Sequence, residues 1–247
     1  MLKKFTLKNY KNFKDKISIN FKNTAGYQFS TDCIVDGTIS KMLIYGRNAT
    51  GKTNLGMALM DINATMFGGM RYNDRGIFLN ADSTEETADF SYEFGFENDE
   101  LVYRYARFSN QELKEEELII NGRTIFYCDF ENHKFAFQNL EYINAETAST
   151  DRYLQSMDIV DEEELEESKL PFLRWMISNV ALNKDSVLLK LVYYVRRMQI
   201  VRVGNGILRL PRRWNDSFYE SLEDSDKLQD FEEFLNEMGI TCKLILK

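Results

Sequence analysis

The stretch GRNATGKTN, residues 46–54, decides how the rest of the sequence is interpreted. Gly46, Gly51, Lys52 and Thr53 meet the spacing G-x-x-x-x-G-K-[ST]. A short apolar run precedes the stretch, and a segment with helical periodicity follows it. A glycine-rich loop in this context can turn its N–H groups inward toward an anion, beside the positive end of the helix. The stretch therefore predicts a cradle for the phosphates of a nucleoside triphosphate.

Each residue type in the cradle has a chemical task. The ammonium of Lys52 is expected against the outer phosphates, and the hydroxyl of Thr53 is expected to bind the Mg²⁺ that bridges them. A glycine-rich helix cap that binds nothing would explain Gly51 but not Lys52 followed by Thr53. ATP and Mg²⁺ are thus the predicted ligands, with Thr53 as the metal ligand. The predicted binding residues of the loop are Gly46, Arg47, Asn48, Ala49, Thr50, Gly51, Lys52, Thr53 and Asn54.

The composition is that of a globular chain. Its 247 residues are 44% hydrophobic and 13% aromatic, enough for one sizeable domain or two small ones. The net charge of −8 argues against a generic nucleic-acid coating protein. Three cysteines without a C-x-x-C pair suggest neither a disulfide framework nor a zinc site, so a reducing cytoplasm is expected. No apolar run approaches the length of a membrane span, so no membrane partner is expected. His133, the single histidine, is expected in a surface turn.

Hydrophobic periodicity predicts strands before the loop and a helix after it. Apolar and polar residues alternate in parts of residues 1–45, as in β-strands. The apolar run 42–45 leads into the loop and is expected to be a central strand. Helical spacing predicts a helix over 55–67 that ends at Gly68 and Gly69.

A second set of strands is expected from residue 88 to about 137, where aromatic residues recur with period two. Asn121-Gly122 between two apolar runs is a strong signal for a hairpin turn. This region is therefore predicted to be an antiparallel meander with aromatic residues on one face. A doubly wound domain would instead continue with alternating helices and parallel strands.

Beyond about residue 147 the pattern is helical. Residues 158–167 are strongly acidic and are expected to be a solvated helix face or a lid. Helices are predicted over 186–198 and 227–238, and a further strand over 241–246.

The loop and the N-terminal Asn9-Tyr10-Lys11-Asn12-Phe13 resemble ATPases of the ABC/SMC superclass, especially RecF-like, OLD-like and related AAA family proteins of bacterial genome maintenance and phage defence. These proteins have a similar loop and begin with an N-F-[KR]-S-F element. The meander after the helix is also similar to their N-terminal lobe. The resemblance implies that Lys11 lies near the phosphates and that residues 9–13 lie near the adenine or ribose.

Elements that would complete such an ATPase are not evident. The sequence shows no convincing Q-loop, LSGG-like signature, Walker B strand or switch histidine. Residues 125–129 imitate a Walker B strand ending at Asp129, but they follow the Asn-Gly turn and are better explained as the second strand of a hairpin. Residues 159–162 are a weaker candidate. We therefore expect the chain to be the N-terminal part of a larger ATPase, either truncated or split from a second polypeptide.

The predicted fold is mixed α/β, the N-terminal lobe of an ABC/SMC-type P-loop NTPase with an incomplete nucleotide-binding domain. The expected divisions are a nucleotide-binding lobe over residues 1–146, a helical segment over 147–239 and the start of a strand over 240–247.

Two basic stretches bear on the partners. Seven lysines lie in the first 22 residues, and six arginines lie between residues 196 and 213. They could contact nucleic-acid phosphates. Without interleaved aromatic residues the favoured interpretation is a solvated surface, or pairing of the arginines with the acidic run 158–167. The arginines of the second stretch are Arg196, Arg197, Arg202, Arg209, Arg212 and Arg213.

Three functions agree with these observations. The first is an ATP-binding lobe that needs a second lobe or a homodimer partner for hydrolysis and drives a conformational switch. The second is a P-loop kinase or other nucleotide-dependent transferase, against which the meander counts. The third is a non-catalytic module that senses ATP and relays its presence to an effector protein.

Overall fold

The computed structural model describes residues 1–26, 28–29, 31–68, 77–158, 170–200, 202–204, 207–209, 225–237 and 243. Contacts within the chain divide it into two compact units, Met1–Met198 and Gln199–Lys247.

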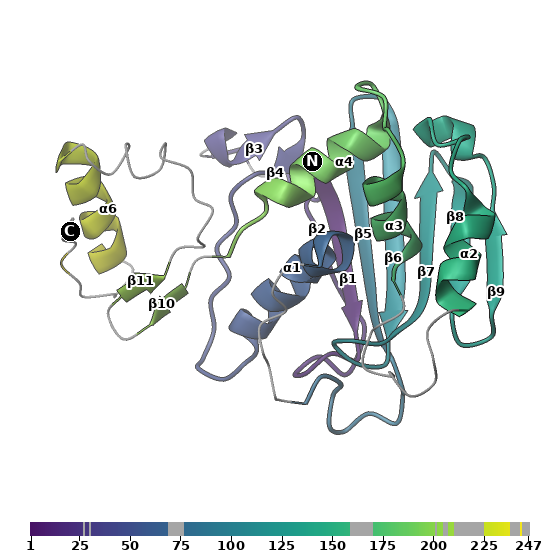
Figure 1. The fold of residues 1–247 in the computed structure, drawn as a ribbon. Coiled ribbons are helices and arrows are strands. Elements are labelled where there is room, and N and C mark those ends of the chain that lie inside the picture. The colour runs from purple at the N-terminus through teal and green to yellow at the C-terminus, as the bar shows by residue number, and fades with distance from the viewer. Residues whose placement is uncertain are drawn as a thin grey trace. The chain divides into compact units, whose positions relative to one another are not determined.

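A seven-stranded antiparallel sheet forms the body of the first unit, in the order β2-β1-β5-β6-β7-β8-β9 (Figure 1). The N-terminal strand β1 lies between β2 and β5, so the start of the chain joins the later meander in one sheet. The strands are β1 (Leu2–Lys8), β2 (Ile17–Asn20), β5 (Ala88–Phe96), β6 (Asp99–Arg107), β7 (Leu113–Ile120), β8 (Arg123–Asp129) and β9 (Lys134–Phe137).

The expected meander is confirmed, because β5 to β9 pair each with the next along the chain. Asn121 and Gly122 form the turn between β7 and β8 with φ of 49° and 75°, the left-handed values that a tight hairpin turn requires. His133 is exposed in the turn before β9, as expected.

One face of the sheet is apolar and aromatic. Phe90, Tyr92 and Phe94 alternate along β5 and are almost completely buried. The opposite face carries partly exposed ion pairs between neighbouring strands, such as Lys4–Glu93 at 2.9 Å. The period-two pattern therefore separates a core face from a polar face.

Helices cover the core face. α1, α3 and α4 lie on the same side of the sheet (Figure 1). Ser186 accepts a hydrogen bond from the Leu188 N–H at the start of α4. The buried face of this helix consists of Val187, Leu188, Leu191, Val192 and Val195. The helices of this unit are α1 (Lys52–Phe67), α2 (Thr150–Asp158), α3 (Phe172–Asn179) and α4 (Val187–Arg197), with short 3₁₀ turns η1 (Thr31–Cys33) and η2 (Leu140–Ile143). A small separate hairpin joins β3 (Ile34–Val35) to β4 (Thr38–Ile39).

The second unit contains a hairpin of β10 (Arg202–Gly204) and β11 (Ile207–Arg209), and a helix, α6 (Ser225–Glu237). The helix predicted over 227–238 is thus confirmed. The predicted strand over 241–246 lies outside the described residues apart from Lys243, as do residues 159–167 of the acidic run. Among the described helices, none is long and apolar enough to cross a membrane.

The predicted central strand over residues 42–45 is wrong. Met42, Leu43, Ile44 and Tyr45 form no strand, and their side chains are between 45% and 88% exposed. A strand requires a neighbour to take up its backbone hydrogen bonds, and none of the described strands pairs with this run. The apolar sequence is present, but the expected sheet partner is not among the described residues.

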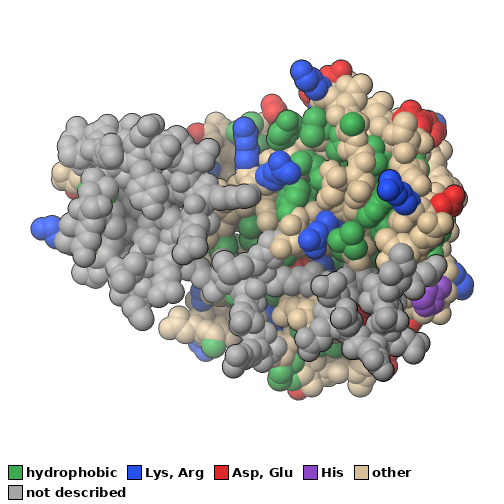
Figure 2. Space-filling view, in the orientation of Figure 1, with side chains coloured by type: hydrophobic (Ala, Val, Ile, Leu, Met, Phe, Trp, Pro, Cys, Tyr) green, Lys and Arg blue, Asp and Glu red, His purple; other side chains and the backbone are tan. Residues whose placement is uncertain are grey.

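The basic residues at the end of α4 are exposed. Arg196 lies 5.1 Å from the centroid of the Phe67 ring, and Arg197 follows it in the last helical turn. Figure 2 shows Lys and Arg side chains among hydrophobic ones on the face that the helices form. Arg212 and Arg213 lie outside the described residues.

Glu116 is a buried carboxyl group on the core face of β7. It accepts a hydrogen bond from the Tyr103 hydroxyl at 2.8 Å and another from the Phe172 N–H at the start of α3. Burial raises its pKa to about 7, although these bonds and the nearby Arg107 act in the opposite direction. Cys128 and Tyr153 are also close enough for Glu116 to act on their pKa values.

Glu116 should make the stability of the fold depend on pH. Its carboxyl group ionises near pH 4.5 when unfolded and near pH 7 when folded, so the folded state binds the proton more tightly. The free energy of unfolding should fall by about 3 kcal/mol from pH 4.5 to pH 7 through this group. Urea unfolding at several pH values should show this slope reduced in Glu116→Gln. Glu117→Gln, on the polar face of the same strand, is the matched control. An unchanged slope in Glu116→Gln would contradict the assignment.

Candidate functional site

The predicted loop is a tight turn at the start of α1. Gly51 has φ 96° and ψ 6°, and Ala49 has φ 63°, so two residues in the left-handed region reverse the chain. The second positive φ of the loop falls on Ala49 and not on Gly46, the first glycine of the motif. The loop is curled rather than extended, as a phosphate cradle requires.

The side chain of Lys52 closes the loop. Its ammonium donates to the carbonyl oxygens of Gly46 at 2.7 Å and Arg47 at 2.6 Å, and the Thr50 hydroxyl donates to Arg47 O at 2.9 Å. Lys52 is partly exposed and Thr53 is exposed, so a ligand can reach both. Phosphate oxygens could take the place of these two carbonyl oxygens as acceptors for the ammonium.

The N-terminal turn, residues 9–13, packs against the loop. A Cβ atom on Gly51 would lie 3.1 Å from both Asn12 Cβ and Phe13 Cζ, so a side chain there would push these neighbours away, and the φ of 96° independently favours glycine. The Asn54 side-chain amide donates to Asn12 Oδ1. The ammonium of Lys11 lies 5.7 Å from the centroid of the Tyr10 ring. Residues 9–13 are therefore beside the cradle, while the role of Lys11 toward phosphates stays a prediction.

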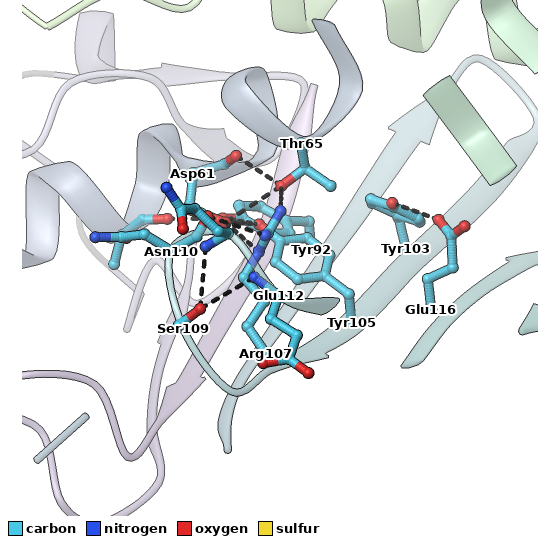
Figure 3. Close-up of polar contacts among 12 residues, drawn as sticks. Asp61, Thr65, Tyr92, Tyr103, Tyr105, Arg107, Ser109, Asn110, Glu112 and Glu116 are labelled. Carbon is cyan, nitrogen blue, oxygen red and sulfur yellow. Dashed lines mark hydrogen bonds and ion pairs between the residues drawn. The ribbon is translucent and has the colours of Figure 1, made fainter. Parts of the chain in front are cut away.

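A buried polar network fixes α1 to the sheet (Figure 3). Arg107, at the end of β6, is 1% exposed, and its Nε lies 3.3 Å from Asp61 Oδ2 on α1. Arg107 Nη2 donates to the Thr65 hydroxyl at 2.6 Å, one turn further along the helix. A buried guanidinium needs such partners, because an unpaired charge in the interior is costly.

Two tyrosines extend this network. Tyr105 donates its hydroxyl hydrogen to Asp61 Oδ2 at 2.8 Å, and Tyr92 donates to Ala58 O at 2.7 Å. Burial raises the pKa of both phenols well above the usual value, so they remain donors. Hydrogen bonds from the sheet thereby hold Ala58, Asp61 and Thr65, which lie in the second, third and fourth turns of α1.

The other end of α1 is held by α3 and α4. Gly68 caps the helix with φ 64°, and its N–H donates to Ala64 O at 2.8 Å. A side chain at Gly68 would overlap the guanidinium of Arg174 from α3. Asn63 donates to Val195 O, at the end of α4, at 2.7 Å. The helix that carries the loop is thus anchored along its length.

The structure brings the predicted binding residues together at the loop and places Asp129, the Walker B candidate, in a different part of the sheet. Residues 46–54 form the loop and the start of α1, and Lys11 lies in the adjacent turn. Asp129, the weak Walker B candidate, lies in β8 and accepts hydrogen bonds from the backbone and side-chain amides of Asn132 at 2.9 Å. The prediction that residues 125–129 form the second strand of a hairpin is confirmed, because they belong to β8, which pairs with β7. In the sheet, β5, β6 and β7 lie between β8 and β1. Residues 159–162 lie outside the described residues.

Sequence reasoning missed Asp61 and Arg107. A signal was present for Arg107, because the alternation along β6 that buries Tyr103 and Tyr105 also places residue 107 on the core face. A charge at a core-facing position indicates a buried partner. Asp61 could not be chosen as that partner, because the choice depends on how α1 lies across the sheet.

The curled loop, its lysine and the anchored helix define a P-loop nucleotide-binding protein. Residues 41–185 match the family described as "AAA domain, putative AbiEii toxin, Type IV TA system". The chain belongs to this family of P-loop ATPases. No curated protein matches the sequence.

Breaking the buried ion pair should destabilise the fold strongly. Arg107→Met leaves Asp61 without its cation and should lower the free energy of unfolding by about 3–5 kcal/mol in urea titrations. Arg104→Met, which removes a half-exposed partner of Glu117 from the same strand, should cost under about 1 kcal/mol. Equal losses for the two variants would contradict the importance of the buried pair.

Proposed function

We propose that the chain is the ATP-binding lobe of an ABC/SMC-type ATPase, which hydrolyses ATP only together with a second lobe or partner and uses it to drive a conformational switch. The observation that carries this proposal is the closed P-loop, in which the Lys52 ammonium already lies 2.7 Å and 2.6 Å from two loop carbonyl oxygens. A bound phosphate would compete with these two oxygens for the ammonium.

Within this site, the chain's own groups bind and orient the nucleotide. The backbone N–H groups at the start of α1 point out of the helix and can donate to phosphate oxygens. Lys52 adds a positive charge, and Thr53 offers a hydroxyl oxygen as a metal ligand. Mg²⁺ held there would neutralise negative charge of the phosphates. The donor set matches the chemistry of both ligands.

The exposed run Met42–Tyr45 supports the need for a second lobe. Four consecutive large apolar residues, each at least 45% exposed, are an unfavourable surface for an isolated protein. A strand supplied by the second lobe could pair with this run and cover it. The same lobe would bring the carboxylate that positions the attacking water. Asp129 does not supply it, because both of its carboxylate oxygens already accept hydrogen bonds from Asn132.

The family description supports a role in a toxin–antitoxin or phage-defence system. In such a role, ATP binding would switch the state of an effector protein. Nucleic acid remains a candidate partner through the exposed Arg196 and Arg197.

Replacing Lys52 should test the cradle. Lys52→Ala removes a charge-assisted hydrogen bond to phosphate, so the Kd for ATP with Mg²⁺ should rise roughly 10- to 100-fold in calorimetric titrations. Lys41→Ala is the control, because Lys41 is an exposed lysine near the loop that pairs with Asp32 at 2.9 Å. An unchanged Kd in Lys52→Ala would refute the cradle. Steady phosphate release by the chain alone would refute the need for a partner.

A further inference from the structure

The turn beside the loop has an unfavourable backbone conformation. Asn9 and Lys11 have φ of 51° and 48°, in the left-handed region that residues with a Cβ atom adopt rarely. Two cross-turn hydrogen bonds join Tyr10 and Phe13, at 2.9 Å and 2.8 Å. A strained turn of this kind persists only where the surrounding structure holds it, and such turns concentrate at functional sites.

Residues 78–87 hold the turn in place. The buried side-chain amide of Asn9 donates to the carbonyl oxygens of Glu85 and Thr87, both at 2.8 Å. Asn80 donates to Lys11 O at 2.6 Å, and the Lys11 N–H donates to Phe78 O at 3.0 Å. Both residues with positive φ are therefore fixed by hydrogen bonds from one segment of the chain.

The turn presents Asn12 to the first turn of α1. Asn12 Oδ1 accepts from the side-chain amide of Asn54, which directly follows Thr53. Asn12 Cβ and Phe13 Cζ also stand 3.1 Å from the place of a Cβ atom on Gly51. The same turn thus contacts Gly51, which precedes Lys52, and Asn54, which follows Thr53.

From these contacts we infer that Asn12 is a positioning residue of the phosphate cradle. Through Asn54 it holds the first turn of α1, and with it the Thr53 hydroxyl and the N–H groups that face the phosphates. Asn12 therefore affects how tightly the phosphates are bound, and it makes no contact with the base of the nucleotide. This inference rests on the proposed function, because it needs a ligand in the cradle.

Asn12 and Asn9 differ in how far they are buried. Asn12 is exposed, whereas Asn9 is completely buried. Truncating Asn12 should therefore change the fold's stability little, in contrast to truncating Asn9. A side chain that contacted the adenine or ribose directly would affect ATP but not a ligand without a nucleoside.

The test compares ATP with inorganic tripolyphosphate, both with Mg²⁺, by calorimetric titration. Asn12→Ala should raise the Kd of both ligands by the same factor, about fivefold, as for the loss of one neutral hydrogen bond. Asn54→Ala should have a similar effect, and the double variant should lose no more than either single one. Asn183→Ala, at an exposed asparagine before α4, should bind like the wild type.

The outcomes separate the inference from the proposed function. A wild type that binds neither ligand would refute the proposed function. A wild type that binds both, with Asn12→Ala unchanged, would overturn the inference alone. Loss of ATP affinity without loss of tripolyphosphate affinity would also overturn it, in favour of direct contact with the nucleoside. Additive losses in the double variant would show that Asn12 does not act through Asn54. Equal melting temperatures of variants and wild type exclude unfolding as the cause.

Discussion

The buried ion pair between Asp61 and Arg107 is the contact on which the site depends, because it fixes the P-loop helix to the sheet. Arg107 ends β6, and Asp61 lies in the middle of α1, so the pair joins the meander to the helix that begins at Lys52. Tyr105 and Thr65 complete it with hydrogen bonds of 2.8 Å and 2.6 Å. A helix held this firmly gives the loop at its start a defined place in the fold.

A fixed helix leaves the loop and its neighbours as the parts that can respond to a ligand. Lys52 and Thr53 are reachable from solvent, and the bonds of Lys52 are to carbonyl oxygens that phosphates could replace. The anchors at the far end, Asn63 to Val195 and Phe67 to Arg196, connect α1 with α4. These two contacts add to those from the sheet in keeping α1 in place when the loop binds a ligand.

Much of this fold could be predicted from local patterns. The helix after the loop, the meander and its Asn121-Gly122 turn follow from periodicity and turn chemistry within short windows. Residues 42–45 show the limit of such reasoning, because an apolar run becomes a strand only beside a partner strand. The Asp61–Arg107 pair shows another limit, since its members are far apart in sequence and meet only through the packing of α1 on β6. The contact of Asn12 with Asn54 could not be foreseen for the same reason.

The central claim is that residues 46–53, at the start of the anchored α1, bind the phosphates of ATP. A crystal structure of the protein with Mg²⁺ and a non-hydrolysable ATP analogue tests it most directly. In that structure the Lys52 ammonium should leave Gly46 O and Arg47 O for the phosphate oxygens, Thr53 should bind the metal ion, and Asp61 should stay paired with Arg107. A nucleotide bound elsewhere, with Lys52 still bonded to the two carbonyl oxygens, would contradict the account.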